Sequence, residues 1–241
     1  MILQAILITL LTTVTSGIST ITGFGTTTIC MPILLFFFPF HQTILFIAII
    51  HWFQNIWRLI LFKKGCCKKI IFYFAIPAMI SSIIGARISI HMPENILIKI
   101  FGTFLIIYST IIILKPKFML KEKMTTSITG GLFSGFFSGI IGLGGAFRAA
   151  FLNAFNLGKN AYIFTTNAIS FFIDTVRVPV YFSNGTKLSK FFFIAILMFI
   201  PTSLFATFLS KKLISKMPQE KFRLIVTIFL GFAGLYFILM K

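Results

Sequence analysis

Charged side chains are scarce in this chain, and one of them lies where it could do chemistry. Of the four acidic residues, Glu94, Glu122 and Glu220 fall in short polar stretches, whereas Asp174 falls inside an apolar run. A carboxylate at such a depth is expensive without a partner and therefore indicates a functional residue. Arg177 lies three positions later, one helical turn away on the same face, and is the expected partner. Because burial and a neighbouring arginine act on its protonation in opposite directions, Asp174 is a candidate carrier of a coupled proton.

A second polar triad lies 119 positions earlier in the chain and has the same spacing as the triad that contains Asp174. In each triad the residues are spaced i, i+4 and i+7, so they share one face of an otherwise apolar helix. Rare polar residues that recur in register indicate an internal duplication. The triads are Ser170, Asp174 and Arg177, and His51, Asn55 and Arg58.

The arginines of the two triads, Arg58 and Arg177, are candidate anion ligands, because a guanidinium binds an oxyanion through two parallel hydrogen bonds. Each lies about five residues from the end of its apolar run, so snorkelling to the membrane surface is the alternative. Asn55 is the uncharged counterpart of Asp174. Histidine titrates near neutral pH, so His51 is a second candidate proton carrier, or else a hydrogen-bonded packing residue.

Two glycine-rich stretches, 16–32 and 134–151, repeat in the same register, with Gly23 aligned to Gly142. Glycine permits a sharp chain reversal, and a helix that starts after such a turn presents unpaired N–H groups that suit an anion. Close helix packing by small residues is the alternative. The candidate substrate ligands are Gly23, Gly25, Thr26, Thr27, Asn55, Arg58, Ser138, Gly142, Gly144, Gly145, Arg148, Asn167 and Arg177.

The two copies differ in their polar residues, and the differences favour the second copy as the seat of the chemistry. Arg148 follows the second glycine turn, where we expect it to contact the substrate or to make the two gates unequal. The second copy carries Gly145, Arg148 and Asp174 at the positions where the first carries Thr26, Ile29 and Asn55.

The composition predicts an integral membrane protein. Hydrophobic residues make up 58% of the chain and charged residues 11%, against roughly a quarter charged in soluble domains. The net charge of +18 comes from lysines and arginines in short loops, which indicate topology and contact with lipid head groups rather than nucleic acid binding. Cys30, Cys66 and Cys67 form neither a disulfide framework nor a spaced metal motif, so no cofactor or metal is expected. Two free thiols are expected at Cys66 and Cys67, with acylation as the alternative.

The distribution of basic residues predicts the topology. Loops 63–69, 115–123 and 211–223 hold thirteen lysines and arginines, and loops 91–95 and 183–190 hold two. The arms of a glycine stretch, such as 2–15 and 26–38, are short for full spans, which favours a hairpin that enters and leaves the membrane on one side. With such hairpins, all three loops rich in basic residues face the cytoplasm, as short cytoplasmic loops should. The expected fold is all-α, with two inverted repeats that each contain a glycine-broken hairpin and three transmembrane helices. Repeat 1–119 has hairpin 2–38 and spans 43–62, 70–90 and 96–114; repeat 120–241 has hairpin 125–157 and spans 162–182, 191–210 and 223–240.

These glycine stretches resemble those of the sulfite exporter TauE/SafE family, which comprises membrane permeases of sulfite and organosulfur anions. The resemblance covers both halves and is strongest in GIIGLGG at 139–145, with NLGK at 156–159 and TTN at 165–167 also similar. The first copy keeps MPIL at 31–34 but has Thr26 where a second glycine pair is usual. The second copy has Ala149-Ala150 where a proline is expected.

The resemblance implies a secondary transporter of small sulfur-containing or related organic anions in the cell membrane. It would alternate access around a midplane site formed by the two glycine turns. Its energy would come from an ion gradient, with a proton as the candidate coupling ion, or from the substrate gradient itself. An anion channel is the alternative, since the same turns and arginines could serve one. An intramembrane enzyme has less support, because only Asp174 and His51 lie at depth. The particular anion, the direction of transport and the oligomeric state are left open.

Overall fold

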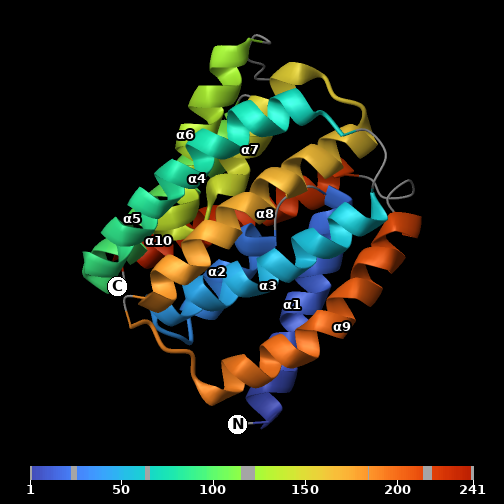
Figure 1. Cartoon of the computed structure of the whole chain (residues 1–241). Helices are drawn as coiled ribbons and strands as arrows, with labels where there is room; N and C mark the ends of the chain where they lie inside the picture. The colour runs from blue at the N-terminus through green and yellow to red at the C-terminus, as the bar shows by residue number, and fades with distance from the viewer. Residues whose placement is uncertain are drawn as a thin grey trace.

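The computed structural model describes residues 2–22, 26–62, 66–114, 123–183, 185–213 and 219–239. Within these ranges the chain is helical and contains no strand, which confirms the all-α class. In chain order (Figure 1) the helices are α1 (Ile2–Thr22), α2 (Thr26–Leu35), α3 (Phe40–Leu61), α4 (Lys68–His91), α5 (Glu94–Leu114), α6 (Met124–Ile141), α7 (Gly144–Leu152), the 3-10 turn η1 (Asn153–Phe155), α8 (Lys159–Ser183), α9 (Lys190–Leu213) and α10 (Gln219–Leu239).

Five helices in the described part of the chain, α1, α3, α4, α5 and α9, are long and apolar enough to cross a membrane. About 20 apolar residues are needed for that, at a rise of 1.5 Å per residue. Many phenylalanine, isoleucine and leucine side chains lie exposed on the outer faces of the helices. A surface of this kind suits hydrocarbon rather than water.

Helix α1 is longer than the predicted arm 2–15, because it continues through the first glycine-rich stretch to Thr22. Hydroxyl groups just before and within that stretch bond back to the preceding turn: Thr15 donates to the Leu11 carbonyl and Thr20 to the Ser16 carbonyl, both at 2.9 Å. Such bonds let serine and threonine remain helical in an apolar setting. The expectation that this arm is too short to span was therefore wrong.

Helices from the first and second halves of the chain pack against each other in pairs (Figure 1). Helix α4 lies beside α6, and α1 lies beside α9, with α3 and α8 between these pairs. At the α4–α6 contact the backbones approach so closely that a Cβ at Gly135 would lie 2.0 Å from the Ala78 carbonyl oxygen. At the α1–α9 contact hydroxyls are used instead: Thr13 and Thr202 share a 2.8 Å hydrogen bond. Small residues thus set the helix packing, as they often do in membranes.

Two further pairs run antiparallel. In α3 and α8, Trp52 bonds Thr175 while Arg58, six residues later, bonds Asn167, so the chains run in opposite directions. In α5 and α10, Gly102 and Gly234 meet at their backbones. The α3–α8 crossing lies at the centre of the molecule and carries most of the buried charged groups.

Candidate functional site

The carboxylate of Asp174 is the hub of the α3–α8 crossing. Its Oδ1 accepts hydrogen bonds from Arg177 Nε at 2.8 Å and lies 2.7 Å from Arg177 Nη2. Its Oδ2 accepts from His51 Nδ1 at 2.9 Å and from Asn55 Nδ2 at 3.0 Å. The side chain is buried, and both oxygens have charged or polar donors, which is the condition for keeping a buried carboxylate ionised.

Arg177 is held within the protein rather than snorkelling to the surface, since it is 2% exposed. Besides its two contacts with Asp174, its Nη1 donates to the Ser138 carbonyl of α6. Its guanidinium is therefore neutralised by one carboxylate and fixed to one backbone carbonyl. Tyr181, one turn further along α8, donates its hydroxyl to the neighbouring Gly139 carbonyl. Together Arg177 and Tyr181 fasten α8 to the end of α6.

The second glycine turn is built by the local sequence. Gly142 adopts the left-handed conformation at φ 75°, which favours glycine, and its N–H donates to the Ser138 carbonyl while Leu143 donates to Phe137. Gly144 opens α7, where a Cβ would lie 1.9 Å from Ser138 Oγ. Ser134 closes the turn by donating to the Gly144 carbonyl at 2.9 Å. Only glycine fits at this point, so α7 turns back directly against α6.

Arg58 is surrounded by uncharged acceptors. Its Nε and Nη2 donate to Thr20 Oγ1 at 3.0 and 2.8 Å, and its Nη2 also reaches Ser19 Oγ at 3.1 Å and the Ser16 carbonyl at 3.2 Å. Its Nη1 donates to Asn167 Oδ1 of α8 at 3.2 Å. The side chain is 5% exposed. Hydroxyls and carbonyls solvate the cation, but none of them cancels its charge.

Arg148 likewise donates its hydrogen bonds to uncharged acceptors. It lies on α7, is 6% exposed, and donates from Nε to Thr166 Oγ1 at 2.9 Å and from Nη1 to Ser134 Oγ at 3.4 Å. Among the described residues neither Arg148 nor Arg58 forms an ion pair with a carboxylate. Burying an uncompensated charge is costly, so these two cations are candidates for contact with an anion.

Both free cations face one cavity. It has a volume of about 50 Å³ and is lined by Arg58 and Arg148 together with Thr20, Tyr162, Asn167 and Ser170. A smaller cavity of about 20 Å³ lies on the Asp174 side and is lined by Thr27, Thr28 and Ser138 among others. His51, Gly145, Arg148 and Ser170 line both cavities. A small ion held by Arg148 would therefore lie within reach of both.

The structure brings most of the predicted site residues together but leaves some apart. Thr27, His51, Arg58, Ser138, Gly142, Gly145, Arg148, Asn167, Asp174 and Arg177 line one or both cavities, and Asn55 contacts the hub. Thr26 instead donates to Gln54 Oε1, and Gly144 lies packed beneath the turn. Gly23 and Gly25 lie outside the described residues.

Several residues that sequence reasoning did not single out take part in the site. Ser16 and Thr20 bind Arg58, and Gln54 donates to the Ser16 carbonyl at 3.1 Å. Tyr181 continues the polar face of Asp174 and Arg177 by one more turn, so its spacing was a usable signal. For Ser16 and Thr20 the signal was weaker, because serine and threonine are common in apolar helices and bond to their own backbone.

Long apolar helices around a buried cationic centre define a multi-pass helical membrane protein. The family profile described as Sulfite exporter TauE/SafE matches residues 8–237. The chain therefore belongs to the sulfite exporter TauE/SafE family, and the predicted resemblance is confirmed. This is a family of membrane transporters, which agrees with a permease rather than an enzyme. No curated protein matches the chain at a significant level.

Proposed function

We propose that the protein is a secondary transporter of small sulfur oxyanions or related anions in the cell membrane, and that the anion binds between Arg58 and Arg148. The observation that carries this proposal is the pair of buried guanidiniums that share one cavity without a carboxylate partner in the described chain. A guanidinium binds an oxyanion through the N–H groups that it does not already use, and Arg58 uses its Nε and Nη2 on residues of α1. The hydroxyls of Thr20 and Ser170 at the cavity wall already donate to the Ser16 and Thr166 carbonyls, so the guanidiniums are the main donors to the anion.

The charges of the centre support a doubly charged substrate. Three guanidiniums, those of Arg58, Arg148 and Arg177, are buried near one carboxylate, that of Asp174. With His51 neutral, two positive charges are left uncompensated. A divalent oxyanion would balance them, whereas a monovalent anion would leave one. Arg177 already forms an ion pair with Asp174 and a hydrogen bond with the Ser138 carbonyl. Its proposed role is therefore to position α8 rather than to bind the substrate.

Alternating access between two inverted repeats is part of the proposal, and the helix pairs support it. The helices at corresponding places in the two halves, α3 with α8 and α5 with α10, pack against each other antiparallel. Asn55 and Asp174, which are 119 positions apart, touch each other directly. Contact between equivalent residues is what a two-fold axis between the repeats would produce, and so supports the proposal. Rocking of one half against the other about such an axis would open the cavities to each side in turn.

We further propose that His51 and Asp174 together carry the coupled proton. His51 lies between the two cavities and bonds Asp174 through Nδ1. The buried Asn55 Oδ1 next to them has no hydrogen-bond partner among the described residues, so it is free to accept from a protonated group of the hub. Protonation there would change the charge beside the anion and so link the two bindings.

The test is uptake of labelled sulfite into vesicles that contain the purified protein. We expect saturable uptake that Arg148→Gln and Arg58→Gln each reduce by tenfold or more. Arg87→Gln is the matched control, because Arg87 is an exposed arginine on α4 outside both cavities. Equal activity of all three variants contradicts the proposed site, and an ohmic anion current instead of saturable uptake contradicts a carrier and favours a channel.

The proton role has a separate test. In the His51→Gln variant the side chain can still donate to Asp174 but does not titrate, so we expect uptake to lose its dependence on an imposed pH gradient while exchange of internal for external sulfite continues. An unchanged dependence on the pH gradient contradicts the proton role and leaves the anion site standing.

A further inference from the structure

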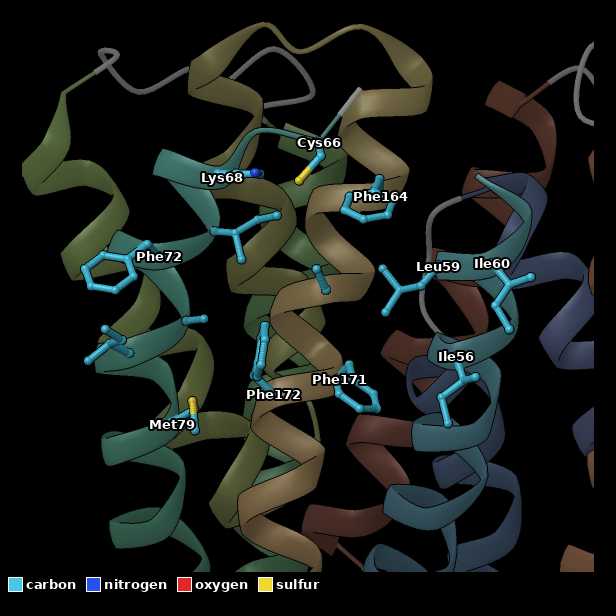
Figure 2. A pocket seen from close by; sticks show the side chains of 14 residues that line it. Ile56, Leu59, Ile60, Cys66, Lys68, Phe72, Met79, Phe164, Phe171 and Phe172 are labelled. Atoms are coloured by element: carbon cyan, nitrogen blue, oxygen red, sulfur yellow. The ribbon is translucent and has the colours of Figure 1, made fainter. Parts of the chain in front are cut away.

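A long apolar groove opens on the outside of the molecule between α3, α4 and α8 (Figure 2). Its volume is about 910 Å³. In Figure 2 helix α8 lies between α4 on one side and α3 on the other, and side chains from all three helices line the groove. Among them, Ile60, Phe72, Ile76 and Phe172 are exposed. The groove therefore faces the surroundings of the protein, which in a membrane are lipid chains.

The polar groups of the groove are gathered at one end. Cys66 and Lys68 lie together at that end in Figure 2, and Met79 lies at the far end. The eleven residue-to-residue steps of α4 from Lys68 to Met79 span about 16 Å at 1.5 Å per step. A ligand that fills the groove must accordingly have an anionic head and a hydrocarbon tail at least about 16 Å long.

The positive charge of Lys68 favours an anionic lipid head group. Lys68 is exposed and has no carboxylate within ion-pair distance in the described residues. It belongs to the stretch KKGCCKK at 63–69, which contains four lysines and no acidic residue. Lysine clusters next to membrane spans attract anionic lipids by electrostatics. A neutral lipid would gain only the burial of its chain, which any apolar surface of the protein also offers.

We propose that this groove binds one anionic phospholipid, with its phosphate at the Lys68 ammonium and one acyl chain lying along α3, α4 and α8. The assignment is independent of the transport proposal. It does place the lipid against the outer side of the helix that holds the cavity, because Ala168 and Phe171 line the groove while Asn167 and Ser170 line the cavity. An occupied groove would hold α8 between α3 and α4.

Trp52 is a built-in reporter of the groove. Its ring stacks on that of Phe171, with centroids 5.5 Å apart, and Phe171 lines the groove. The chain has one other tryptophan, Trp57, so the Trp57→Phe variant leaves Trp52 as the sole source of indole fluorescence. Bromine atoms in the middle of an acyl chain quench indole at short range. Quenching of Trp52 by brominated phospholipid therefore measures occupation of the groove.

The experiment reconstitutes the Trp57→Phe protein in vesicles in which a brominated lipid replaces unbrominated phosphatidylcholine stepwise. We expect brominated phosphatidylglycerol to quench Trp52 at about fivefold lower mole fraction than brominated phosphatidylcholine, the size of effect expected from one lysine at an anionic head group. Lys68→Gln should abolish this preference, and Lys68→Arg should retain it.

The matched control is Lys99→Gln. Lys99 is likewise exposed and lines another apolar groove, of about 680 Å³, between α5, α6 and α7. The same charge is removed there from the same kind of surface, so the preference measured at Trp52 should persist. Equal quenching by the two brominated lipids overturns the proposal. So does an equal loss of preference in Lys68→Gln and Lys99→Gln, because that result would reflect the overall charge of the protein.

Discussion

Arg58 and Arg177 occupy equivalent positions in the two halves of the chain, yet they end in different electrostatic states. Arg177 lies against Asp174 and is neutralised, whereas Arg58 lies among hydroxyls and carbonyls and keeps its charge. The difference follows from a single position, which is aspartate in the second half and asparagine in the first. Asn55 even donates its amide to Asp174, so the one carboxylate holds both halves together.

Arg148 modifies the comparison, because its equivalent in the first half is the apolar Ile29. The cavity thus contains one uncompensated arginine from each half, on different elements: Arg58 on α3 and Arg148 on α7. The sequence led us to expect the chemistry mainly in the second half. In the proposed site the second half supplies the fixed ion pair, and each half supplies one of the two arginines without a carboxylate partner.

The largest expected effect comes from removing the charge that distinguishes the halves. Asp174→Asn makes the α8 position identical to Asn55 and leaves Arg177 buried without a counter-ion. We expect the free energy of unfolding to fall by about 3 kcal/mol, the usual cost of breaking a buried ion pair on one side. Thermal unfolding of the purified variant measures it. The double variant Asp174→Asn/Arg177→Gln should recover part of the loss, and additive losses in the double variant would contradict the pairing.

The next effect compares the two free cations. If the anion binds between them, Arg58→Gln and Arg148→Gln should each weaken sulfite binding by a similar factor, about 30-fold, or roughly 2 kcal/mol for the loss of a charged hydrogen-bonding partner. The shift in unfolding temperature with sulfite concentration measures the affinity. A large loss for Arg148→Gln with none for Arg58→Gln would return the site to the second half alone.

The glycine turn offers a smaller effect with a neighbouring control. A methyl group at Gly144 would collide with Ser138 Oγ, whereas at Gly145 the nearest atom is Arg148 Nη2 at 3.6 Å. We expect Gly144→Ala to reduce the free energy of unfolding by about 1.5 kcal/mol through overpacking, and Gly145→Ala to leave it nearly unchanged. Thermal unfolding of both variants decides this. Equal stability of the two would mean that the turn is not packed as described.

The smallest effect concerns one hydrogen bond that only the second half has. Tyr181 donates to the Gly139 carbonyl, and its equivalent in the first half is Phe62. Tyr181→Phe should therefore cost about 1 kcal/mol of stability, the net contribution of a typical buried hydrogen bond. Chemical denaturation in detergent gives the value. If the variant is as stable as the parent protein, the hydroxyl does not fasten α8 to α6.

Sequence reasoning found the ion pair and the helix face that carries it, because Arg177 follows the buried carboxylate by one helical turn on the same face. The register of 119 residues also brought Asn55 and Asp174 into correspondence, and these two side chains touch. The cage around Arg58 could not be foreseen in the same way. Ser16, Ser19 and Thr20 lie some forty residues away in the chain, and only the packing of α1 against α3 decides which hydroxyls an arginine meets.

The length of α1 was not predicted correctly either, because it also depends on hydrogen bonds that form only in the folded chain. Glycine and hydroxyl residues at 16–20 read as a break, but in the folded chain the hydroxyls bond backwards and the helix continues to Thr22. The roles of the individual site residues stay predictions, since they depend on a ligand rather than on the chain alone.

The most direct test of the anion site is to locate the anion itself. Selenite has the charge and shape of sulfite and contains selenium, whose anomalous X-ray scattering marks its position in a crystal of the selenite-soaked protein. We predict a selenium peak in the cavity between Arg58 and Arg148, absent in the Arg148→Gln protein. A peak elsewhere in the membrane region, or a peak that persists in that variant, would contradict the account.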